Sequence, residues 1–114
     1  MKIREIITLV QAEVLCGDTQ LDEIQMNAFA SDLMSDVLTI KMGDFMLITG
    51  LANIQSIRTA EMSDIKCVLL VRGKKATKEM IELAQDNGMV LLCTHFSMFK
   101  TAGILFEAGI SPVY

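Results

Sequence analysis

Three groups of residues in this sequence could do chemistry, and the first is Cys93-Thr94-His95. Side chains two residues apart on a strand point to the same face, so the Cys93 thiol and the His95 imidazole could lie together. Nucleophilic catalysis also needs an orienting acid and an oxyanion hole, which the surrounding sequence does not supply. His95 is the only histidine. We therefore interpret Cys93 as a core residue and His95 as a strand-end residue, and predict no catalytic residue.

The second group is Asp32 and Asp36, one turn apart on a helix predicted over residues 31–40 with Ser31 as its cap. Carboxylates at this spacing repel each other by about 0.2–0.5 kcal/mol unless a cation neutralises them. They could therefore meet a metal ion or a basic partner, or form a solvated helix face. A hard metal ion needs a third oxygen ligand, which the sequence does not place. We predict no metal site and take both residues as candidate interface residues.

The third group is basic and surrounds Gly73: it comprises Arg72, Lys74, Lys75 and Lys78. One interpretation is a phosphate site assisted by backbone N–H groups, and the other is a solvated basic turn. Neither of the patterns G-x-x-x-x-G-K-[ST] and G-x-G-x-x-G occurs. Residues 72–114 hold five basic and four acidic residues, whereas residues 1–71 hold five and ten. Any anion site is therefore expected in the second part of the chain.

Apolar patterning predicts the elements that position these groups. Helices are expected over residues 2–11, 31–40, 53–62, 77–86 and 97–108, and strands over 13–16, 23–30, 45–48, 66–71 and 89–93. Short apolar strands that alternate with helices are typical of a parallel sheet covered on both faces. Gly88 and Gly109 each follow a helix, as capping glycines do. We predict one α/β domain over residues 1–114, with three layers: a mostly parallel sheet and helices on both faces.

Ligands bind such sheets beyond the carboxyl ends of the strands. Helices begin at the same edge, where Asn53, Thr77 and Ser97 are candidate caps, and free helix N–H groups favour an anion. Gly50 follows a buried strand, where glycine permits close approach of a ligand or simply makes a tight turn. The candidate ligand-binding residues are Thr49, Gly50, Asn53, Arg72, Gly73, Thr94 and Ser97.

The composition limits the class of protein and of partner. The 114 residues are 52% hydrophobic and carry a net charge of -4, which argues against nucleic acids and anionic membranes as partners. No apolar run exceeds five residues, far short of the ~20 of a membrane-spanning helix. The charged residues near the N-terminus argue against a signal peptide. Three cysteines without a zinc-binding pattern, of which Cys16 and Cys67 are expected in the core, indicate a reduced, cytoplasmic protein.

The apolar content also predicts self-association. The mean hydropathy is +0.44, high for a domain that buries only about two thirds of its unfolded surface. We expect a homodimer to cover the remaining apolar surface, with an apolar monomer as the alternative. The nine methionines favour core filling or a dimer seam over an adaptable partner surface.

Several segments together resemble the DRTGG domain in its stand-alone form. They are I-R-E-I (3–6), S-D-L-M-S-D-V-L (31–38), I-T-G (48–50) with N-I (53–54), V-L-L (68–70) with R-G (72–73), G-M-V-L-L (88–92) and F-K-T-A-G (99–103). The resemblance implies a compact α/β domain, usually dimeric, similar in fold to the N-terminal domain of HPr kinase. Related domains lie between CBS domains in regulated pyrophosphatases and are attached to phosphotransacetylases. The string D-R-T-G-G itself is absent.

These observations lead to three hypotheses. The first is a non-catalytic regulatory or accessory domain, homodimeric, that binds a small anionic ligand such as a nucleotide and needs no cofactor. The second is a subunit of a larger redox or signalling assembly that acts only through contacts with a partner enzyme or signalling protein. The third is a small transferase or hydrolase that uses Cys93, Thr94 or His95. The sequence favours the first.

Overall fold

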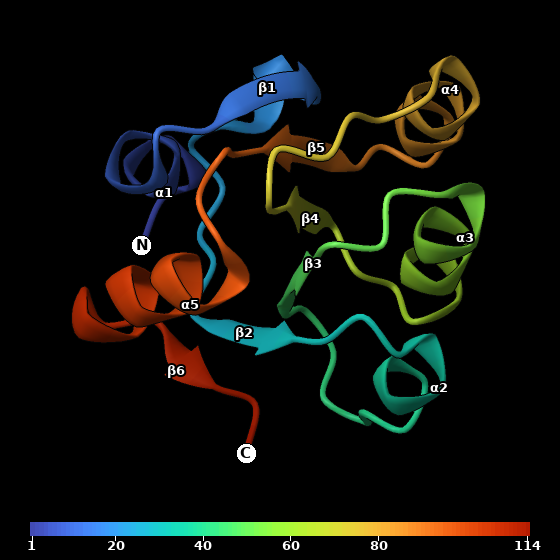
Figure 1. The fold of residues 1–114 in the computed structure, drawn as a ribbon. Coiled ribbons are helices and arrows are strands. Elements are labelled where there is room, and N and C mark those ends of the chain that lie inside the picture. The colour runs from blue at the N-terminus through green and yellow to red at the C-terminus, as the bar shows by residue number, and fades with distance from the viewer.

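The computed structural model describes residues 1–114, and its centre is a six-stranded sheet in the order β1-β5-β4-β3-β2-β6. The strands are β1 (Glu13–Cys16), β2 (Asn27–Ala30), β3 (Met46–Thr49), β4 (Cys67–Leu70), β5 (Val90–Cys93) and β6 (Ser111–Pro112). Strand β1 runs antiparallel to β5, and every other neighbouring pair is parallel (Figure 1). The prediction of a mostly parallel sheet is confirmed.

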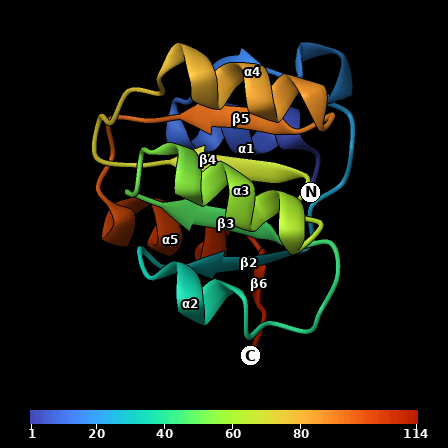
Figure 2. The same ribbon diagram turned by 90° about the vertical axis from the view of Figure 1, so that its right-hand side faces the viewer.

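Helices cover both faces of this sheet. Helices α1 (Ile3–Val10) and α5 (Met98–Glu107) pack against each other on one face. The other face carries α2 (Met34–Val37), α3 (Ile54–Met62) and α4 (Lys78–Asp86), which lie side by side in Figure 2. The three-layer α/β architecture is therefore confirmed. None of these helices has the length and apolar character needed to cross a bilayer.

The two central strands separate two hydrophobic cores. Leu47 and Val68 face the core under α2, α3 and α4, whereas Met46 and Cys67 face the core under α1 and α5. Every residue of β3 and β4 is buried, because helices cover both sides of these strands. The cores thus hold the carboxyl ends of β2, β3, β4 and β5 together at one edge of the sheet.

Local capping signals determine where the three long helices after β3 begin. Asn53, Thr77 and Ser97 each accept the backbone N–H of the residue three positions later, at 3.1–3.2 Å. Gly88 and Gly109 follow α4 and α5 with φ angles of 66° and 111°, in the conformation that glycine adopts most easily. These predicted caps are confirmed, and all three helices begin at the carboxyl edge of the sheet.

The helix predicted over residues 31–40 is wrong in extent. Helix α2 covers only Met34–Val37, and its N-cap is Leu33 rather than Ser31. The Ser31 hydroxyl instead accepts the Leu33 N–H at 3.0 Å, in a turn that precedes the helix. Asp32 lies in that turn and not in the first turn of the helix. Its carboxylate accepts hydrogen bonds from the last residue of β3 and the turn after it.

Two further strand predictions differ from the structure. The strand expected over residues 23–30 forms only at Asn27–Ala30, while Ile24 makes an isolated bridge with Lys2. Strand β6 was not expected, and it pairs with β2 at the edge of the sheet. Its proline occupies an edge strand, where a missing N–H is tolerated.

Candidate functional site

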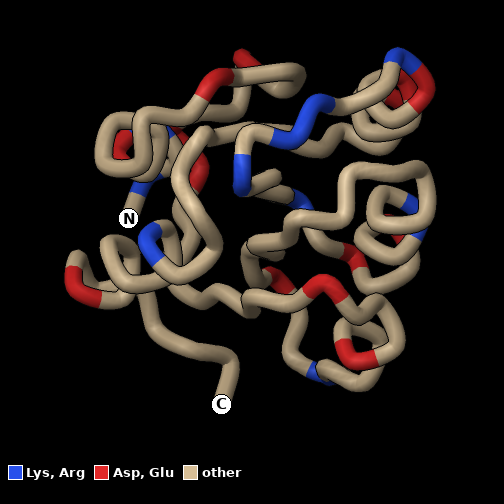
Figure 3. The backbone as a smooth tube through the Cα atoms, viewed as in Figure 1, with Lys and Arg blue, Asp and Glu red and all other residues tan.

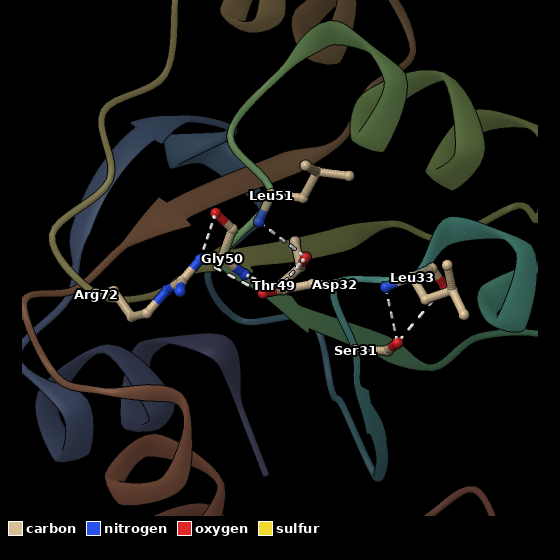
Figure 4. Close-up of polar contacts among 7 residues, drawn as sticks. All are labelled: Ser31, Asp32, Leu33, Thr49, Gly50, Leu51 and Arg72. Atoms are coloured by element: carbon tan, nitrogen blue, oxygen red, sulfur yellow. Dashed lines mark hydrogen bonds and ion pairs between the residues drawn. The ribbon is translucent and has the colours of Figure 1, made fainter.

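Polar groups from three neighbouring strand ends converge at the carboxyl edge of the sheet (Figure 4). Asp32 follows β2, Thr49 and Gly50 close β3, and Arg72 follows β4. The Asp32 carboxylate accepts the Gly50 N–H at 2.6 Å and the Thr49 hydroxyl at 3.1 Å through Oδ1. Its Oδ2 lies 3.4 Å from the Arg72 guanidinium. We call these four residues the strand-end cluster.

The Thr49 hydroxyl has both of its hydrogen-bonding roles filled. It donates to Asp32 and accepts the Leu51 N–H at 3.1 Å, which closes the turn after β3. The Thr49 side chain is fully buried, so these bonds replace those that water would make. The buried end of β3 therefore fixes the position of the Thr49 hydroxyl within the cluster.

The Arg72 side chain passes so close to residue 50 that only glycine fits there. A Cβ on Gly50 would overlap the guanidinium of Arg72. Arg72 also donates to the Gly50 carbonyl at 3.3 Å, so the guanidinium is attached to the β3 turn as well as to Asp32. This contact explains a glycine at a position where φ is not positive.

Arg72 has an unfavourable backbone conformation that its neighbours stabilise. Its φ of 65° is left-handed, which costs a non-glycine residue roughly 1–2 kcal/mol. The Arg72 N–H donates to the Phe96 carbonyl at 2.8 Å, and the Gly73 N–H donates to the Thr94 carbonyl at 3.0 Å. The backbone donors of this turn are therefore occupied, contrary to the expectation that they would assist in binding an anion. The guanidinium, with the side chain 49% exposed, remains as the donor.

The other predicted ligand-binding residues have structural contacts of their own. The Thr94 hydroxyl is buried, donates to the Val10 carbonyl at 2.6 Å and accepts the Phe96 N–H at 3.2 Å. Asn53 and Ser97 cap α3 and α5. The structure thus brings Thr49, Gly50 and Arg72 together with Asp32, whereas the remaining four shape the edge around them.

Asp32 and Asp36 do not form the predicted pair on one helix. Asp32 lies before α2 and belongs to the strand-end cluster, while Asp36 lies exposed within α2. Sequence reasoning assigned Asp32 to an interface and missed its contacts with Thr49, Gly50 and Arg72. The signal that could have found it is its position directly after a predicted strand, at the edge where the other strands also end.

Exposed basic residues continue the strand-end cluster toward α4. Figure 3 shows Lys and Arg gathered along the segment that follows β4. Arg72, Lys74 and Lys75 are all exposed there, and Lys78 begins α4 with a side chain 91% exposed. This segment gives the carboxyl edge a positive surface beside the Asp32 carboxylate.

The cysteine environments disfavour thiolate chemistry. Partial burial and the nearby Glu13 carboxylate, 3.9 Å from Sγ, raise the pKa of the Cys93 thiol. Strand β5 ends at Cys93, so His95 lies in the following turn and the strand alternation does not extend to it. Cys16 and Cys67 are buried core thiols as predicted, and burial raises the pKa of Cys67 to about 12. No cluster of three His, Cys, Asp or Glu side chains could hold a metal ion.

Two cavities lie away from the strand-end cluster. One, of about 580 Å³, has polar walls at the opposite edge of the sheet and includes Gln25, whose buried Oε1 has no partner. The other is an apolar groove of about 430 Å³ between α5, β2 and the C-terminal segment. We call it the α5/β6 groove; its walls include Ala102 and Gly103, and the exposed rings of Phe99, Phe106 and Tyr114 surround it.

Comparison with known proteins places the chain in a family. The model of the DRTGG domain family matches residues 5–108. A similar fold occurs in the crystal structure of the CBS and DRTGG domains of the regulatory region of Clostridium perfringens pyrophosphatase, complexed with the activator diadenosine tetraphosphate, with a TM-score of 0.74 and 15% identity. That match covers 98% of this chain and 48% of the other. No curated protein matches the sequence. Since the family model spans most of its length, the chain belongs to the DRTGG domain family.

Proposed function

We propose that residues 1–114 act as one regulatory, non-catalytic DRTGG domain that binds a small phosphate-bearing ligand, such as a nucleotide, at the carboxyl edge of its sheet. The observation that carries this proposal is the convergence of the Gly50 N–H, the Thr49 hydroxyl and the Arg72 guanidinium on one carboxylate. A backbone N–H, a hydroxyl and a guanidinium are the donors that commonly hold phosphate oxygens.

The surroundings of the strand-end cluster support an anionic ligand. Lys74 and Lys75 add exposed positive charge after Arg72. Asn53 and Ser97 cap helices of nine and ten residues, whose positive dipole ends lie at the same edge. The Gly73 N–H donates to the Thr94 carbonyl, and this hydrogen bond joins the turn after β4 to the turn after β5. In this proposal three of the seven residues predicted for ligand binding contact the ligand, and the other four shape the edge around it.

The similar pyrophosphatase region was crystallised with diadenosine tetraphosphate, which is a nucleotide with a chain of phosphates. At 15% identity that likeness concerns the fold, so the ligand of this chain has to be tested directly. ATP and diadenosine tetraphosphate are suitable probes because both carry several phosphates.

Thermal unfolding with and without these probes tests the proposal. Binding at a hundred times Kd adds about 2.7 kcal/mol, which raises the melting temperature of a domain of this size by roughly 10 °C. We expect this rise for the wild-type chain and for Arg58→Gln, which removes an exposed arginine from α3. Arg72→Gln should abolish most of it. A flat response of the wild-type chain, or an undiminished response of Arg72→Gln, would contradict the proposal.

A homodimer through the α5/β6 groove is the second part of the proposed function. Phe99, Phe106 and Tyr114 are 90%, 67% and 88% exposed. Aromatic side chains of 150–250 Å² each, exposed to this extent, would bury roughly 500 Å² per partner in a dimer. A standard interface buries about 800 Å² per partner, so surface around the groove has to contribute the remainder.

The arrangement of rings around the groove supports a two-fold dimer. In such a dimer the same patch of both copies forms the interface, so the patch needs protruding parts and hollows that match each other. Here the exposed Phe99 and Phe106 rings project beside Ala102 and Gly103, where an added Cβ at Gly103 would meet open space. A ring of one copy can therefore enter the hollow of the other. This geometry favours a second copy over an unrelated partner enzyme or signalling protein.

The proposed setting is the cytoplasm. All three cysteines are unpaired, and Cys16 and Cys67 are buried as thiols. Such thiols persist in a reducing compartment, where disulfides are rare.

A further inference from the structure

The proposed anion site is already occupied by a side chain of the same protein. Asp32 Oδ1 takes the Gly50 N–H and the Thr49 hydroxyl, and Oδ2 faces the Arg72 guanidinium. Both carboxylate oxygens are thus in the positions where the oxygens of a phosphate would lie. A ligand cannot accept the Gly50 N–H while Asp32 holds it at 2.6 Å.

We propose that Asp32 is a built-in competitor for the ligand. Its carboxylate occupies the anion-binding position in the free protein and has to leave before a phosphate group binds there. Asp32 therefore lowers the affinity for anions. The inference rests on the proposed function and specifies how the same site is regulated.

The structure allows Asp32 to move without unfolding its neighbours. Its side chain is 45% exposed and can enter water from its present position. The flanking backbone is held independently, because the Ser31 N–H donates to the Ile48 carbonyl and the Ser31 hydroxyl accepts the Leu33 N–H. Rotation of the Asp32 side chain is then sufficient to vacate the site.

The donors remain in place when Asp32 leaves. Arg72 keeps its hydrogen bond to the Gly50 carbonyl at 3.3 Å, and the unsubstituted Gly50 still leaves room for the guanidinium. Thr49 is fully buried in the sheet and keeps the Leu51 N–H. The vacated site therefore presents three converging donors and no resident negative charge.

The free energy needed to displace Asp32 determines how much this side chain weakens anion binding. If the occupied conformation accounts for about 90–99% of the free protein, the apparent affinity for an anion falls about 10–100-fold. Substitution by alanine removes this competition together with one negative charge. A competitor of this kind differs from a purely structural carboxylate because its removal frees the Gly50 N–H and the Thr49 hydroxyl for the anion, whereas removal of a structural carboxylate would disorder these donors.

The experiment compares Asp32→Ala with Asp36→Ala, which removes the same charge from an exposed position on α2. Inorganic phosphate and ATP are titrated into each protein by calorimetry, and the Gly50 amide is followed by NMR. We expect Asp32→Ala to bind phosphate at least tenfold more tightly than the wild-type chain and Asp36→Ala, with the Gly50 amide shifting on binding. Asp32→Asn keeps an acceptor without the charge and should lie between them, which preserves the test if the alanine variant folds poorly.

The outcomes separate this inference from the proposed function. If the wild-type chain binds ATP through Arg72 but Asp32→Ala and Asp32→Asn bind no more tightly, the competitor is refuted while the ligand site stands. If only the Asp32 variants bind phosphate or ATP, the competitor is supported and the wild-type chain is not a nucleotide sensor at this edge. If no variant binds either anion, both proposals fall.

Discussion

The strand-end cluster and the α5/β6 groove differ in almost every physical property. The cluster is polar, and its groups are connected to one another by hydrogen bonds of 2.6–3.3 Å. The groove is apolar, hollow and surrounded by exposed aromatic rings. The first surface can recognise a ligand by the direction and charge of a few donors, whereas the second can associate only through buried area. The proposed ligand site and the proposed dimer interface thus lie on separate surfaces, which predicts that each can be altered without the other.

A charge in the α5/β6 groove should change the dimer affinity more than any other substitution considered. Phe99→Glu places a charge in the α5/β6 groove and should weaken the dimer at least about 30-fold, since buried aromatic anchors contribute about 2–4 kcal/mol to an interface. Met62→Glu is the matched control, because Met62 is 68% exposed on α3, on the opposite face of the sheet. Analytical ultracentrifugation should show dimers for the wild-type chain and Met62→Glu, and monomers for Phe99→Glu. A monomeric wild-type chain would contradict the proposal that the groove is a dimer interface.

The next largest effect distinguishes contact residues from frame residues within the carboxyl edge. Thr49→Val and Thr94→Val each remove a buried hydroxyl that both donates and accepts, which should cost about 1–3 kcal/mol of unfolding free energy. Urea denaturation measures that loss. Only Thr49→Val should also reduce nucleotide affinity. Equal loss of affinity in both variants would show that Thr94 contacts the ligand as well.

A pair of glycines tests the two surfaces against each other. Gly50→Ala should displace the Arg72 guanidinium and lower nucleotide affinity about tenfold, or 1.4 kcal/mol, with dimerisation unchanged. Gly103→Ala lies within α5, where alanine favours the helix by about 0.8–1.0 kcal/mol, and its methyl group would partly fill the hollow of the groove. It should therefore weaken the dimer and leave ligand affinity intact. Titration and ultracentrifugation of both variants would reveal any crossed effect, which would mean that the two surfaces are coupled.

The smallest effect acts on the core beneath both surfaces. Burial raises the pKa of Cys67 to about 12, against about 9 in the unfolded chain. Between these values the unfolded state releases a proton that the folded state retains, so stability falls as the pH rises, by at most about 1.4 kcal/mol per pH unit. Well below pH 9 this thiol contributes no pH dependence. Urea denaturation from pH 8 to 9.5, over which the loss is about 0.8 kcal/mol, should show a shallower decline for Cys67→Ala than for the wild-type chain, and equal slopes would contradict the assignment.

Most of the fold was predictable because its signals are local. Apolar runs mark β3, β4 and β5, and Asn53, Thr77 and Ser97 mark the helix starts through bonds made three residues away. The short strand β6 carries no such run. Strand β6 forms through its pairing with β2, and this is a tertiary contact that the local sequence does not indicate.

The strand-end cluster was only partly predictable for the same reason. Thr49, Gly50 and Arg72 were identified from their places at strand ends. Asp32 was assigned to a helix because Ser31-Asp32 has the composition of a helix start. In the structure its carboxylate bonds to residues 17, 18 and 40 positions away, and these contacts override the local preference.

An NMR titration of the wild-type chain with ATP would locate the phosphate site, because it reports on the strand-end cluster and the α5/β6 groove in one experiment. Amide shifts should concentrate at the turns after β2, β3 and β4, with Gly50 among the largest, while Gly103 in the α5/β6 groove stays unchanged. The same titration of Arg72→Gln should show these shifts strongly reduced. Shifts that centre on the groove, or an unperturbed spectrum at saturating ATP, would contradict a phosphate site at the carboxyl edge of the sheet.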